Sequence, residues 1–405
     1  MAEKNFILFD DDCRDHLLPF TFTRPVAELR VGILTIKEKW QRSLNIHLTY
    51  FTQAYLQKKY PFTNNGLCCF INGSVLPDPR LVAQVLSLQP GELIEENNFE
   101  QTGKSLLIAF CDFYSNERID NLQINDLVKD FIRIAPANSP KTIRRKEDIF
   151  VKNSEALRDD YKLITYKRRS ATIYESNKVV NRNNIFIEEG AKVEFAYLNA
   201  STGPIYIGKN AEVMEGAMMR GPVSIGDKSI VKMGTKIYGA TTIGPVCTVG
   251  GEIINSVILG YSNKGHDGFL GNAVIGEWCN LGADSNNSNL KNDYGEVKLW
   301  DYATRRFEPT GMQFCGLMMG DHSKCGINTM FNTGTVVGVF VNVFGAAFPR
   351  NFIPSFQWGG ASGFTEYKYE KAMEVASLVM QRRNVELTDA DKEILLHVHD
   401  LEMKK

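Results

Sequence analysis

A six-residue repeat of aliphatic positions runs through the second half of the chain. A period of six fits neither an amphipathic helix nor a long alternating strand, but it fits short strands separated by turns. A second, mostly small set of residues follows the first by four positions, so we expect both sets to fill the interior of a coil. The first set consists of Ile207, Val213, Met219, Ile225, Val231, Ile237, Ile243 and Val249, and the second of Ala211, Ala217, Val223, Ser229, Thr235, Thr241, Cys247 and Ile253.

The repeat continues after a slip of two residues and is interrupted once. Between Ser288 and Gly316 the period is lost, and the turn residues and alternating apolar positions there predict a loop or hairpin excursion from the coil. The aliphatic set resumes at Val257, Phe269, Ile275 and Leu281 and returns at Met319, Cys325, Phe331, Val337 and Val343. The small set continues as Ala273, Cys279 and Ser285, and then as Ser323, Thr329, Thr335, Val341 and Ala347.

The segments on either side of the repeat have other patterns. The N-terminal "NFILF" predicts a buried strand that ends at three aspartates, and a helix is expected after Gly32, so this part predicts an α/β domain. A further amphipathic helix is expected over residues 143–164. Near the C-terminus, helical spacing starts at Tyr369, and Thr388 with Asp391 forms a capping-box pattern. We therefore divide the chain into an α/β domain (1–155), a linker (156–182), a β-helix (183–350) and a helical tail (351–405).

Composition narrows the classes of function. The chain has 405 residues, of which 43% are hydrophobic, and its formal net charge is −1, so no global field favours nucleic acid or an acidic membrane as a partner. The eight cysteines include no C-x-x-C pair, which indicates buried thiols in a reducing compartment. Neither a secretory signal nor a membrane-spanning segment is evident, and we expect a cytoplasmic protein.

One histidine stands out against the repeat. His266 lies off both interior sets, so the register predicts that it points out of the coil, as do Asn280 and Asn289. A solvated turn residue is one explanation. The other is catalytic, because a histidine with a pKa near neutrality can accept a proton from an attacking amine. Zinc is disfavoured, since only His266 and His322 lie in the coil region and three ligands would be needed.

The stretch around His266 resembles a known acetyltransferase motif. "GHDGFLGNAVIGEWCNLGA" matches G-H-x-x-[YF]-L-G-[DN]-A-x-I-G-x-x-x-N-x-G-A, which is found in GlmU-like bifunctional sugar-1-phosphate nucleotidyltransferase/acetyltransferases of the hexapeptide-repeat family. The resemblance implies a left-handed parallel β-helix, a homotrimer and acetyl-CoA as co-substrate. It also implies that His266 is the base, and that Phe269, Asn280 and Asn289 contact sugar or acyl donor. Lys236 or Lys264 would replace the family's cations for the sugar phosphate.

The stretch from Thr23 to Trp40 is similar to another part of the same family. "TRPVAELRVGILTIKEKW" matches a divergent bacterial branch of the sugar-phosphate nucleotidyltransferases. The resemblance implies a nucleoside triphosphate held by Arg14, Arg24 and Arg30, with Mg²⁺ at Asp11 and Asp78. The family's glycine-rich loop is absent, and Asn72-Gly73 stands where the family has a G-D metal aspartate. In the alternative, Arg24 and Arg30 form structural salt bridges.

Three hypotheses about function follow. The first is a bifunctional transferase of nucleotide-sugar synthesis for the cell envelope, which acetylates glucosamine 1-phosphate or a similar amino sugar and joins it to a nucleotide. The second is a glucose-1-phosphate thymidylyltransferase-like enzyme whose β-helix is purely structural. The third is a non-catalytic scaffold. His266 and its asparagines favour the first hypothesis over the second, and the match over residues 23–40 argues against the third.

Overall fold

The chain divides into two compact units. The computed structural model describes residues 4–63, 66–98, 103–113 and 128–404. The N-terminal unit comprises Met1–Leu17, Thr23–Leu29 and Leu34–Arg145, and the C-terminal unit comprises Leu18–Phe22, Arg30–Ile33 and Lys146–Lys405. Two short segments from the start of the chain therefore belong to the C-terminal unit, and the main division falls at 145/146 rather than at the expected 155/156.

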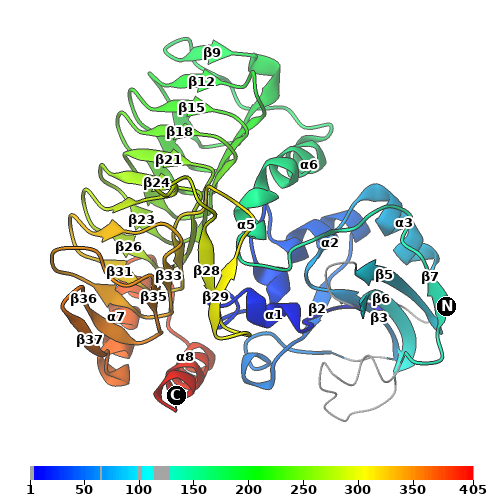
Figure 1. Cartoon of the computed structure of the whole chain (residues 1–405). Coiled ribbons are helices and arrows are strands. Elements are labelled where there is room, and N and C mark those ends of the chain that lie inside the picture. The colour runs from blue at the N-terminus through cyan, green and yellow to red at the C-terminus, as the bar shows by residue number, and fades with distance from the viewer. Residues whose placement is uncertain (1–3, 64–65, 99–102, 114–127, 405) are drawn as a thin grey trace. The chain divides into compact units, whose positions relative to one another are not determined.

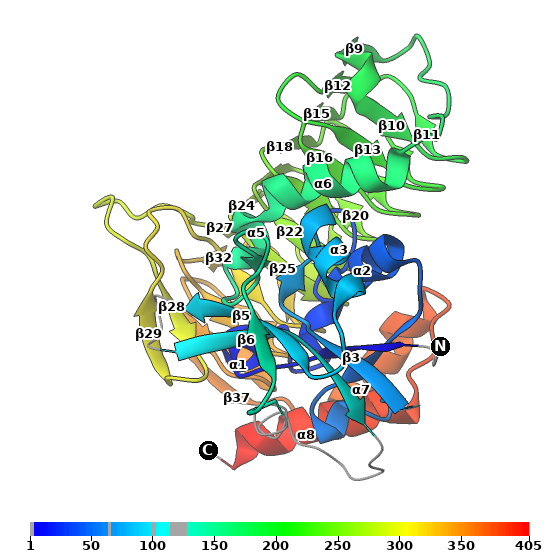
Figure 2. The ribbon, with the colours of Figure 1, turned by 90° about the vertical axis from the view of Figure 1, so that its right-hand side faces the viewer.

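The N-terminal unit is built on a six-stranded mixed sheet, as the α/β pattern predicted (Figure 2). Strand β1 pairs in parallel with β2 and β3, and β6 runs antiparallel to β3 and β5. The sheet order is β2 (Leu48–Phe51), β1 (Asn5–Phe9), β3 (Gly66–Asn72), β6 (Gly103–Phe113), β5 (Glu92–Asn98) and β7 (Ile132–Ile134), and β4 (Val75–Leu76) pairs with β8 (Lys141–Thr142). The helices are α1 (Cys13–His16), η1 (Val26–Glu28), α2 (Ile36–Leu44), η2 (Ala54–Leu56) and α3 (Pro79–Ser87).

Local sequence explains where helix α2 begins and how it is anchored. The hydroxyl of Thr35 accepts a hydrogen bond from the Glu38 amide, and the Glu38 carboxylate accepts one from the Thr35 amide, which completes a capping box. Trp40 on this helix is fully buried, and its indole N–H donates to the carbonyl oxygen of Val75 at 2.8 Å. The indole is thus both packed and hydrogen-bonded, as a buried tryptophan requires.

The C-terminal unit is a three-sided parallel β-helix (Figure 1). The first face carries β10 (Ile185–Ile187), β13 (Ile205–Ile207), β16 (Val223–Ile225), β19 (Thr241–Ile243), β22 (Val257–Gly260), β25 (Val274–Glu277), β30 (Met318–Met319), β33 (Val336–Val337) and β35 (Phe352–Ile353). The second carries β11 (Lys192–Val193), β14 (Glu212–Val213), β17 (Ile230–Val231), β20 (Thr248–Val249), β23 (Asn263–Lys264), β26 (Asn280–Leu281), β31 (Lys324–Cys325), β34 (Asn342–Val343), β36 (Gln357–Gly360) and β37 (Gly363–Glu366). The third carries β9 (Lys178–Val180), β12 (Tyr197–Asn199), β15 (Met218–Arg220), β18 (Lys236–Tyr238), β21 (Glu252–Ile254) and β24 (Phe269–Gly271), and β27 (Asn286–Asn287) pairs separately with β32 (Met330–Phe331).

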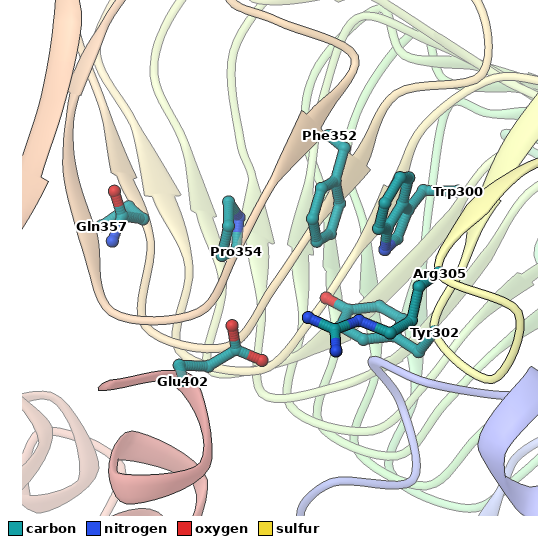
Figure 3. A pocket seen from close by; sticks show the side chains of 7 residues that line it. All are labelled: Trp300, Tyr302, Arg305, Phe352, Pro354, Gln357 and Glu402. Atoms are coloured by element: carbon teal, nitrogen blue, oxygen red, sulfur yellow. The ribbon is translucent and has the colours of Figure 1, made fainter. Parts of the chain in front are cut away.

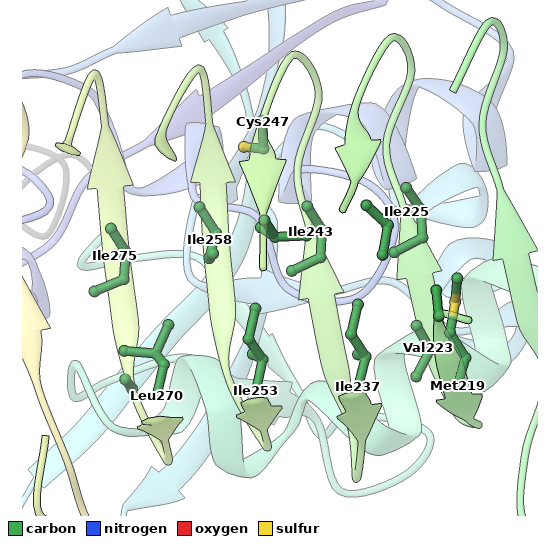
Figure 4. Packing of buried hydrophobic residues seen from close by; sticks show 14 of the residues in the cluster. Met219, Val223, Ile225, Ile237, Ile243, Cys247, Ile253, Ile258, Leu270 and Ile275 are labelled. Atoms are coloured by element: carbon green, nitrogen blue, oxygen red, sulfur yellow. The ribbon is translucent and has the colours of Figure 1, made fainter. Parts of the chain in front are cut away.

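The two predicted sets fill the interior of the coil (Figure 4). Ile225, Val231 and Ile237 are each 0% exposed, so the repeat was interpreted correctly there. Each Å² of apolar surface that is buried stabilises the fold by about 25 cal/mol, and every coil buries several such side chains. The interior side chains are therefore the main source of stability for the C-terminal unit.

The expected register is wrong by one residue over one part of the coil. Ile258 pairs with Ile243, and Leu270 pairs with Ile253, so Ile258 and Leu270 point inward in place of Val257 and Phe269. The steps from Ile253 to Ile258 and from Leu270 to Ile275 span five residues, and a count by sixes cannot follow them. Ala347, expected inside, is exposed because it lies in the segment between β34 and β35, and the interior ladder resumes only at Ile353.

A stack of rings joins the coil to the C-terminal helices. Neighbouring rings along one corner lie 4.3 to 6.1 Å apart, and they pack against helix α7 (Tyr369–Gln381) and helix α8 (Asp389–Met403). Both helices were predicted, including the Thr388 capping box. His322 belongs to this stack and is only 6% exposed, so it is a buried residue of the coil corner. The stack runs through Tyr261, Trp278, His322, Phe340 and Phe356.

The remaining elements of the C-terminal unit lead into the coil or leave it. Helices α5 (Asp148–Val151) and α6 (Asn153–Thr165) occupy the expected helical segment, and η3 (Arg182–Asn184) precedes the first face. The expected excursion is an antiparallel hairpin of β28 (Lys298–Asp301) and β29 (Arg306–Pro309). Among the described residues, no helix is both long and apolar enough for a transmembrane span.

Candidate functional site

His266 lies on a corner of the coil and faces solvent. The corner, residues 265–268, joins β23 on the second face to β24 on the third. The side chain is exposed, and among the described residues no hydrogen bond engages its ring. The ring nitrogens are therefore available to a ligand, as the outward register predicted.

The preceding coil leaves room for this corner. Between β20 and β21 the chain turns with Gly250 and Gly251 alone, whereas the His266 corner has four residues. A methyl group at Gly251 would lie 2.6 Å from the carbonyl oxygen of Gly268 and 3.0 Å from that of His266. The glycine pair thus lets the two corners stack closely, and any side chain there would displace the histidine.

Phe269 and Asn289 lie together beside the His266 corner. A methyl group at Gly271 would lie 2.6 Å from Cζ of Phe269 and 2.8 Å from Nδ2 of Asn289, so both side chains cover the same glycine on the third face. The amide of Phe269 donates to Oδ1 of Asn286 at 2.8 Å, and Nδ2 of Asn289 donates to Oδ1 of Asn272 at 2.8 Å. The structure therefore brings the side chains of two of the three predicted contact residues together over strand β24, which follows the His266 corner.

Asn280 lies around the corner, on the second face. Its Oδ1 accepts a hydrogen bond from Nδ2 of Asn263 at 3.3 Å, and Oδ1 of Asn263 accepts one from the guanidinium of Arg383 at 2.8 Å. Asn280 is exposed. The predicted polar residues therefore lie on both sides of the corner that carries His266, rather than in one pocket.

Lys236 stands on the same face as Phe269, two strands away. The backbone register runs from Lys236 to Glu252 and from Glu252 to Phe269. Adjacent strands are about 4.8 Å apart, so the backbones of Lys236 and Phe269 are separated by about 10 Å. Lys236 is exposed, so its long side chain can reach an anionic group bound over Glu252 and Phe269.

Lys264, by contrast, points into the coil. It pairs with Val249 in the interior column and is only 1% exposed. Its Nζ donates to the carbonyl oxygens of His266 at 2.6 Å and Asp267 at 3.0 Å. Burial lowers the pKa of Lys264 to about 8. A side chain held in this way does not reach a sugar phosphate outside the coil, and Lys236 is the better placed of the two cations.

Sequence reasoning missed the acidic groups near the histidine. Asp267 and Asp284 are exposed, and the amide of Asp284 donates to the carbonyl oxygen of Asp267 at 3.0 Å. Glu252 lies on the adjacent strand and accepts a hydrogen bond from Tyr238 at 2.5 Å, which raises the pKa of that phenol. The six-residue count made no distinction among outward residues, so it gave no reason to single these out.

Two hollows lie elsewhere on the C-terminal unit. One, of about 440 Å³, lies near Asn272 and is lined by Phe150, Val151, Ser154, Ala240, Asn255, Asn272, Met312, Gln313 and Phe314. The other, of about 250 Å³, is lined by Trp300, Tyr302, Arg305, Phe352, Pro354, Gln357 and Glu402 (Figure 3). The first continues from Asn289 through its hydrogen bond to Asn272, so it extends the surface that begins at Phe269.

In the N-terminal unit, polar side chains gather where strand β1 ends. Asp10 is buried, and it accepts hydrogen bonds from the Thr52 hydroxyl at 2.5 Å and the Val26 amide at 2.9 Å. Burial raises the pKa of Asp10 to about 6, although Arg14 opposes the shift. Arg14 Nε lies 4.0 Å from Oδ2 of Asp10, and the guanidinium donates to the Tyr55 hydroxyl. Asp10 therefore anchors the loop that begins at Thr23.

The two predicted metal residues differ in their surroundings. Asp11 Oδ2 accepts a hydrogen bond from Nδ2 of Asn72 at 2.7 Å, and it lies at the carboxyl edge of the parallel strands. Asp78 caps helix α3 by accepting from the amides of Arg80 and Leu81, and its other oxygen accepts from Asn138. Mg²⁺ in nucleotide sites takes one or two carboxylates plus phosphates and water, so Asp11 fits such a role and Asp78 does not. No group of three or more His, Cys, Asp and Glu side chains that could hold an ion occurs among the described residues.

The three predicted arginines do not share one environment. Arg14 and Arg24 belong to the N-terminal unit, and both are largely buried. Arg30 belongs to the C-terminal unit, where its Nε donates to the carbonyl oxygen of Leu259 at 3.2 Å and its guanidinium also donates to Ile33. These bonds to backbone carbonyl oxygens give Arg30 a structural role within the C-terminal unit, and they leave Arg14 and Arg24 as the candidates for phosphate contacts.

The N-terminal part of the chain is similar to a known family. Residues 6–169 match the family model described as sugar nucleotidyl transferase. The chain also resembles GlmU-like bifunctional proteins over part of its length. It is 33% identical over 87 residues to the bifunctional protein GlmU of Methanocaldococcus jannaschii, and 31% identical over 96 residues to a bifunctional sugar-1-phosphate nucleotidylyltransferase/acetyltransferase of Sulfurisphaera tokodaii. These matches cover 22% and 24% of this chain and 21% and 23% of the relatives, so the chain spans about a fifth of the relatives' length.

Solved structures with a similar fold include two acyltransferases. The UDP-N-acetylglucosamine acyltransferase of Arabidopsis is 14% identical, with a TM-score of 0.25 and coverage of 53% of this chain and 80% of that chain. The enzyme of the same name from Francisella novicida is 15% identical, with a TM-score of 0.27 and coverage of 56% and 88%. At these TM-scores nothing about the activity of this chain follows from the likeness.

Proposed function

We propose that the C-terminal unit transfers an acetyl group from acetyl-CoA to the amine of an amino-sugar 1-phosphate such as glucosamine 1-phosphate, with His266 as the base. The observation that carries the proposal is the exposed imidazole on the coil corner, beside Phe269 and within the acetyltransferase-like segment. An amine must lose its proton before it can attack a thioester, and an unengaged imidazole is suited to accept that proton.

The reaction needs one proton relay. The amine nitrogen attacks the thioester carbonyl carbon, and its proton moves to a ring nitrogen of His266. The C–S bond then breaks, and the imidazolium returns the proton to the departing thiolate. The histidine therefore ends each turnover in its starting state, as a general acid–base catalyst requires.

The charges around the corner suit a substrate with one cationic and one anionic end. Asp267, Asp284 and Glu252 lie near the histidine and would attract the ammonium form of the amine. Lys236 stands farther along the same face, where it could pair with a sugar phosphate. This arrangement favours an amino-sugar phosphate over a neutral alcohol as acceptor.

We propose that the protein is a homotrimer in which a neighbouring subunit closes this groove. Large apolar side chains are exposed along the same corner, including Phe195 at 58%, Met233 at 69% and Ile327 at 69%. Monomeric proteins seldom expose a row of such residues, and an interface between copies would bury it.

We also propose nucleotidyl transfer to a sugar 1-phosphate in the N-terminal unit. The phosphate oxygen of the sugar would attack the α-phosphate of a nucleoside triphosphate and release pyrophosphate. Mg²⁺ at Asp11 would neutralise phosphate charge, and Arg14 and Arg24 would hold the phosphates. Changing Arg24 to Ala should abolish pyrophosphate release, whereas unchanged release would give Arg24 a purely structural role.

The decisive experiment for acetyl transfer compares wild type with His266→Ala. Purified protein is incubated with acetyl-CoA and a panel of hexosamine 1-phosphates, and thiol release is followed. Wild type should release thiol with at least one acceptor, and the variant should be slower by about two to four powers of ten. His47→Ala, at an exposed histidine of the N-terminal unit, is the matched control and should behave as wild type.

Two results would contradict the proposal. Wild type that acetylates no amine in the panel would favour the thymidylyltransferase-like alternative with a structural β-helix, provided that pyrophosphate is released. A His266→Ala variant with full acetyl transfer would make His266 a turn residue.

A further inference from the structure

A lysine occupies an interior position of the β-helix. The column that contains Lys264 also contains the apolar residues Val193, Val213, Val231, Val249, Leu281, Cys325 and Val343. Its ammonium group is bonded to backbone carbonyl oxygens alone in the described structure: those of His266 at 2.6 Å, Asp267 at 3.0 Å and Gly250 at 3.4 Å. Burying an ammonium is unfavourable unless it is well hydrogen-bonded, and a hydrocarbon side chain would fill the same space. Packing alone therefore does not explain the lysine.

The corner that Lys264 contacts lacks a bond found at equivalent corners. At three of these corners, the carbonyl oxygen of the first residue accepts a hydrogen bond of 3.3 Å from the amide of the fourth residue. The donor and acceptor pairs are Ala217 and Met214, Thr235 and Lys232, and Ser285 and Gly282. Hydroxyls of Thr235, Ser285 and Thr329 reinforce such corners.

In the His266 corner the fourth residue is Gly268, which has no side chain. Its φ of +113° takes the backbone away from the conformation that closes the other corners. No hydrogen bond from its amide to Gly265 occurs in the described structure. The Lys264 ammonium instead ties the same corner together from the inside of the coil, because it donates to the carbonyl oxygens of His266 and Asp267.

We propose that Lys264 is a positioning residue that holds the His266 corner open to the groove, so that the imidazole faces the acceptor amine. The expected effect of Lys264 on kcat rests on the proposed acetyl transfer. Its expected effect on the orientation of His266 does not. The lysine fixes the backbone carbonyl of His266, and that carbonyl fixes the direction in which the Cα–Cβ bond of the histidine leaves the coil. The substrate is not touched by Lys264.

The test compares Lys264→Met with Leu281→Met. Both variants place methionine in the same interior column, on adjacent coils, and only the first removes the donors to the corner. Acetyl transfer gives kcat and the KM for acetyl-CoA. The ring resonances of ¹³C-labelled histidines report on His266 directly, and the His266→Ala spectrum assigns its signal.

We expect Lys264→Met to lower kcat by about 100-fold, the usual effect of a displacement of about 1 Å at a reacting group, with KM for acetyl-CoA within about twofold of wild type. The His266 resonance should shift or broaden while the other histidine signals stay unchanged, and Leu281→Met should leave both readouts as in wild type. Lys264→Gln retains an N–H donor and should give an intermediate effect.

Different outcomes overturn different statements. An unmoved His266 resonance in Lys264→Met, or a kcat equal to that of wild type, removes the positioning role. Absence of acetyl transfer in wild type removes the proposed function, and the spectrum still decides whether Lys264 orders the corner. If Lys264→Met fails to fold, Lys264→Gln carries the same two readouts, and an unmoved signal there overturns the proposal.

Discussion

The side-chain amide of Asn72 donates a hydrogen bond to the carboxylate of Asp11, with Nδ2 2.7 Å from Oδ2. Asn72 is the last residue of strand β3, and Asp11 lies two residues after the end of the adjacent parallel strand β1. Oδ1 of Asn72 accepts from both the amide and the hydroxyl of Ser74, which fixes the orientation of the side chain. This edge therefore offers one carboxylate and one amide group where two carboxylates would bind a divalent cation more strongly.

Changing Asn72 to Asp should create a stronger metal site. The new carboxylate would face Asp11 at hydrogen-bonding distance, and a divalent cation would relieve the repulsion between the two charges. We expect the Kd for Mn²⁺, measured by titration calorimetry on the whole chain, to fall by at least about tenfold, as one added charged ligand would produce. Asp78→Asn is the control and should leave it unchanged, because Asp78 caps a helix. Unaltered Mn²⁺ affinity in Asn72→Asp would show that Asp11 does not hold the metal.

Changing Gly251 to Ala should displace His266 without unfolding the coil. The added methyl group would meet the carbonyl oxygens of Gly268 at 2.6 Å and His266 at 3.0 Å. The matched control is Gly234→Ala, since Gly234 has a similar φ of +67° but no atom within 4 Å of the added methyl. Both variants carry the same backbone strain, and only the first reaches the histidine. We expect acetyl transfer to fall by about tenfold or more in Gly251→Ala relative to Gly234→Ala, since general-base catalysis depends on placement. Equal rates of acetyl transfer in the two variants would show that catalysis does not depend on the position of the His266 corner.

The sequence was sufficient for the architecture because the repeat encodes it many times. Each buried residue of the regular ladder has an apolar partner on the next coil, as Ile225 has Ile243, so single exceptions do not obscure the period. The exceptions are where sequence reasoning failed. Five-residue steps shift the register near His266, and Lys264 was therefore taken for an outward side chain.

Only the part of the candidate site that lies within one short stretch of sequence could be predicted. The outward direction of His266 followed from the register, whereas Phe269, close to it in sequence, was expected inside the coil and lies outside it. The bond between Asn72 and Asp11 joins residues 61 positions apart, and that between Arg30 and Leu259 joins residues 229 apart. Such pairs are set by tertiary packing, which local pattern does not reveal. Arg30 was accordingly grouped with Arg14, although the two belong to different units.

Asp10 should make the N-terminal sheet less stable as the pH rises through about 6. Burial raises the pKa of this carboxyl from 3.8 to about 6 in the folded state, so the folded protein binds its proton more tightly than the unfolded chain. Stability from this group is fully present below pH 3.8 and is lost as the pH rises through about 6, by about 3 kcal/mol in total. Hydrogen exchange of β1 amides in wild type, compared with Asp10→Asn, should show this loss in wild type alone. Asp12→Asn, at an exposed position, should keep the wild-type dependence. A pH dependence that survives in Asp10→Asn would assign the effect to another group.

Lys264 should give the β-helix the opposite dependence at alkaline pH. Burial lowers the pKa of its ammonium from 10.5 to about 8, so between these values the unfolded chain binds the proton and the folded coil does not. Stability therefore rises with pH over this window, because the unfavourable burial of a charge disappears as the group becomes neutral. The free energy of unfolding of wild type, measured by urea denaturation, should increase relative to that of Lys264→Met by about 3 kcal/mol from pH 8 to pH 10.5. Using the difference between the two proteins cancels the tyrosines and cysteines that titrate in the same range. A difference that stays flat would mean that the ammonium reaches solvent, and Lys264 would then not be the internal support of the His266 corner.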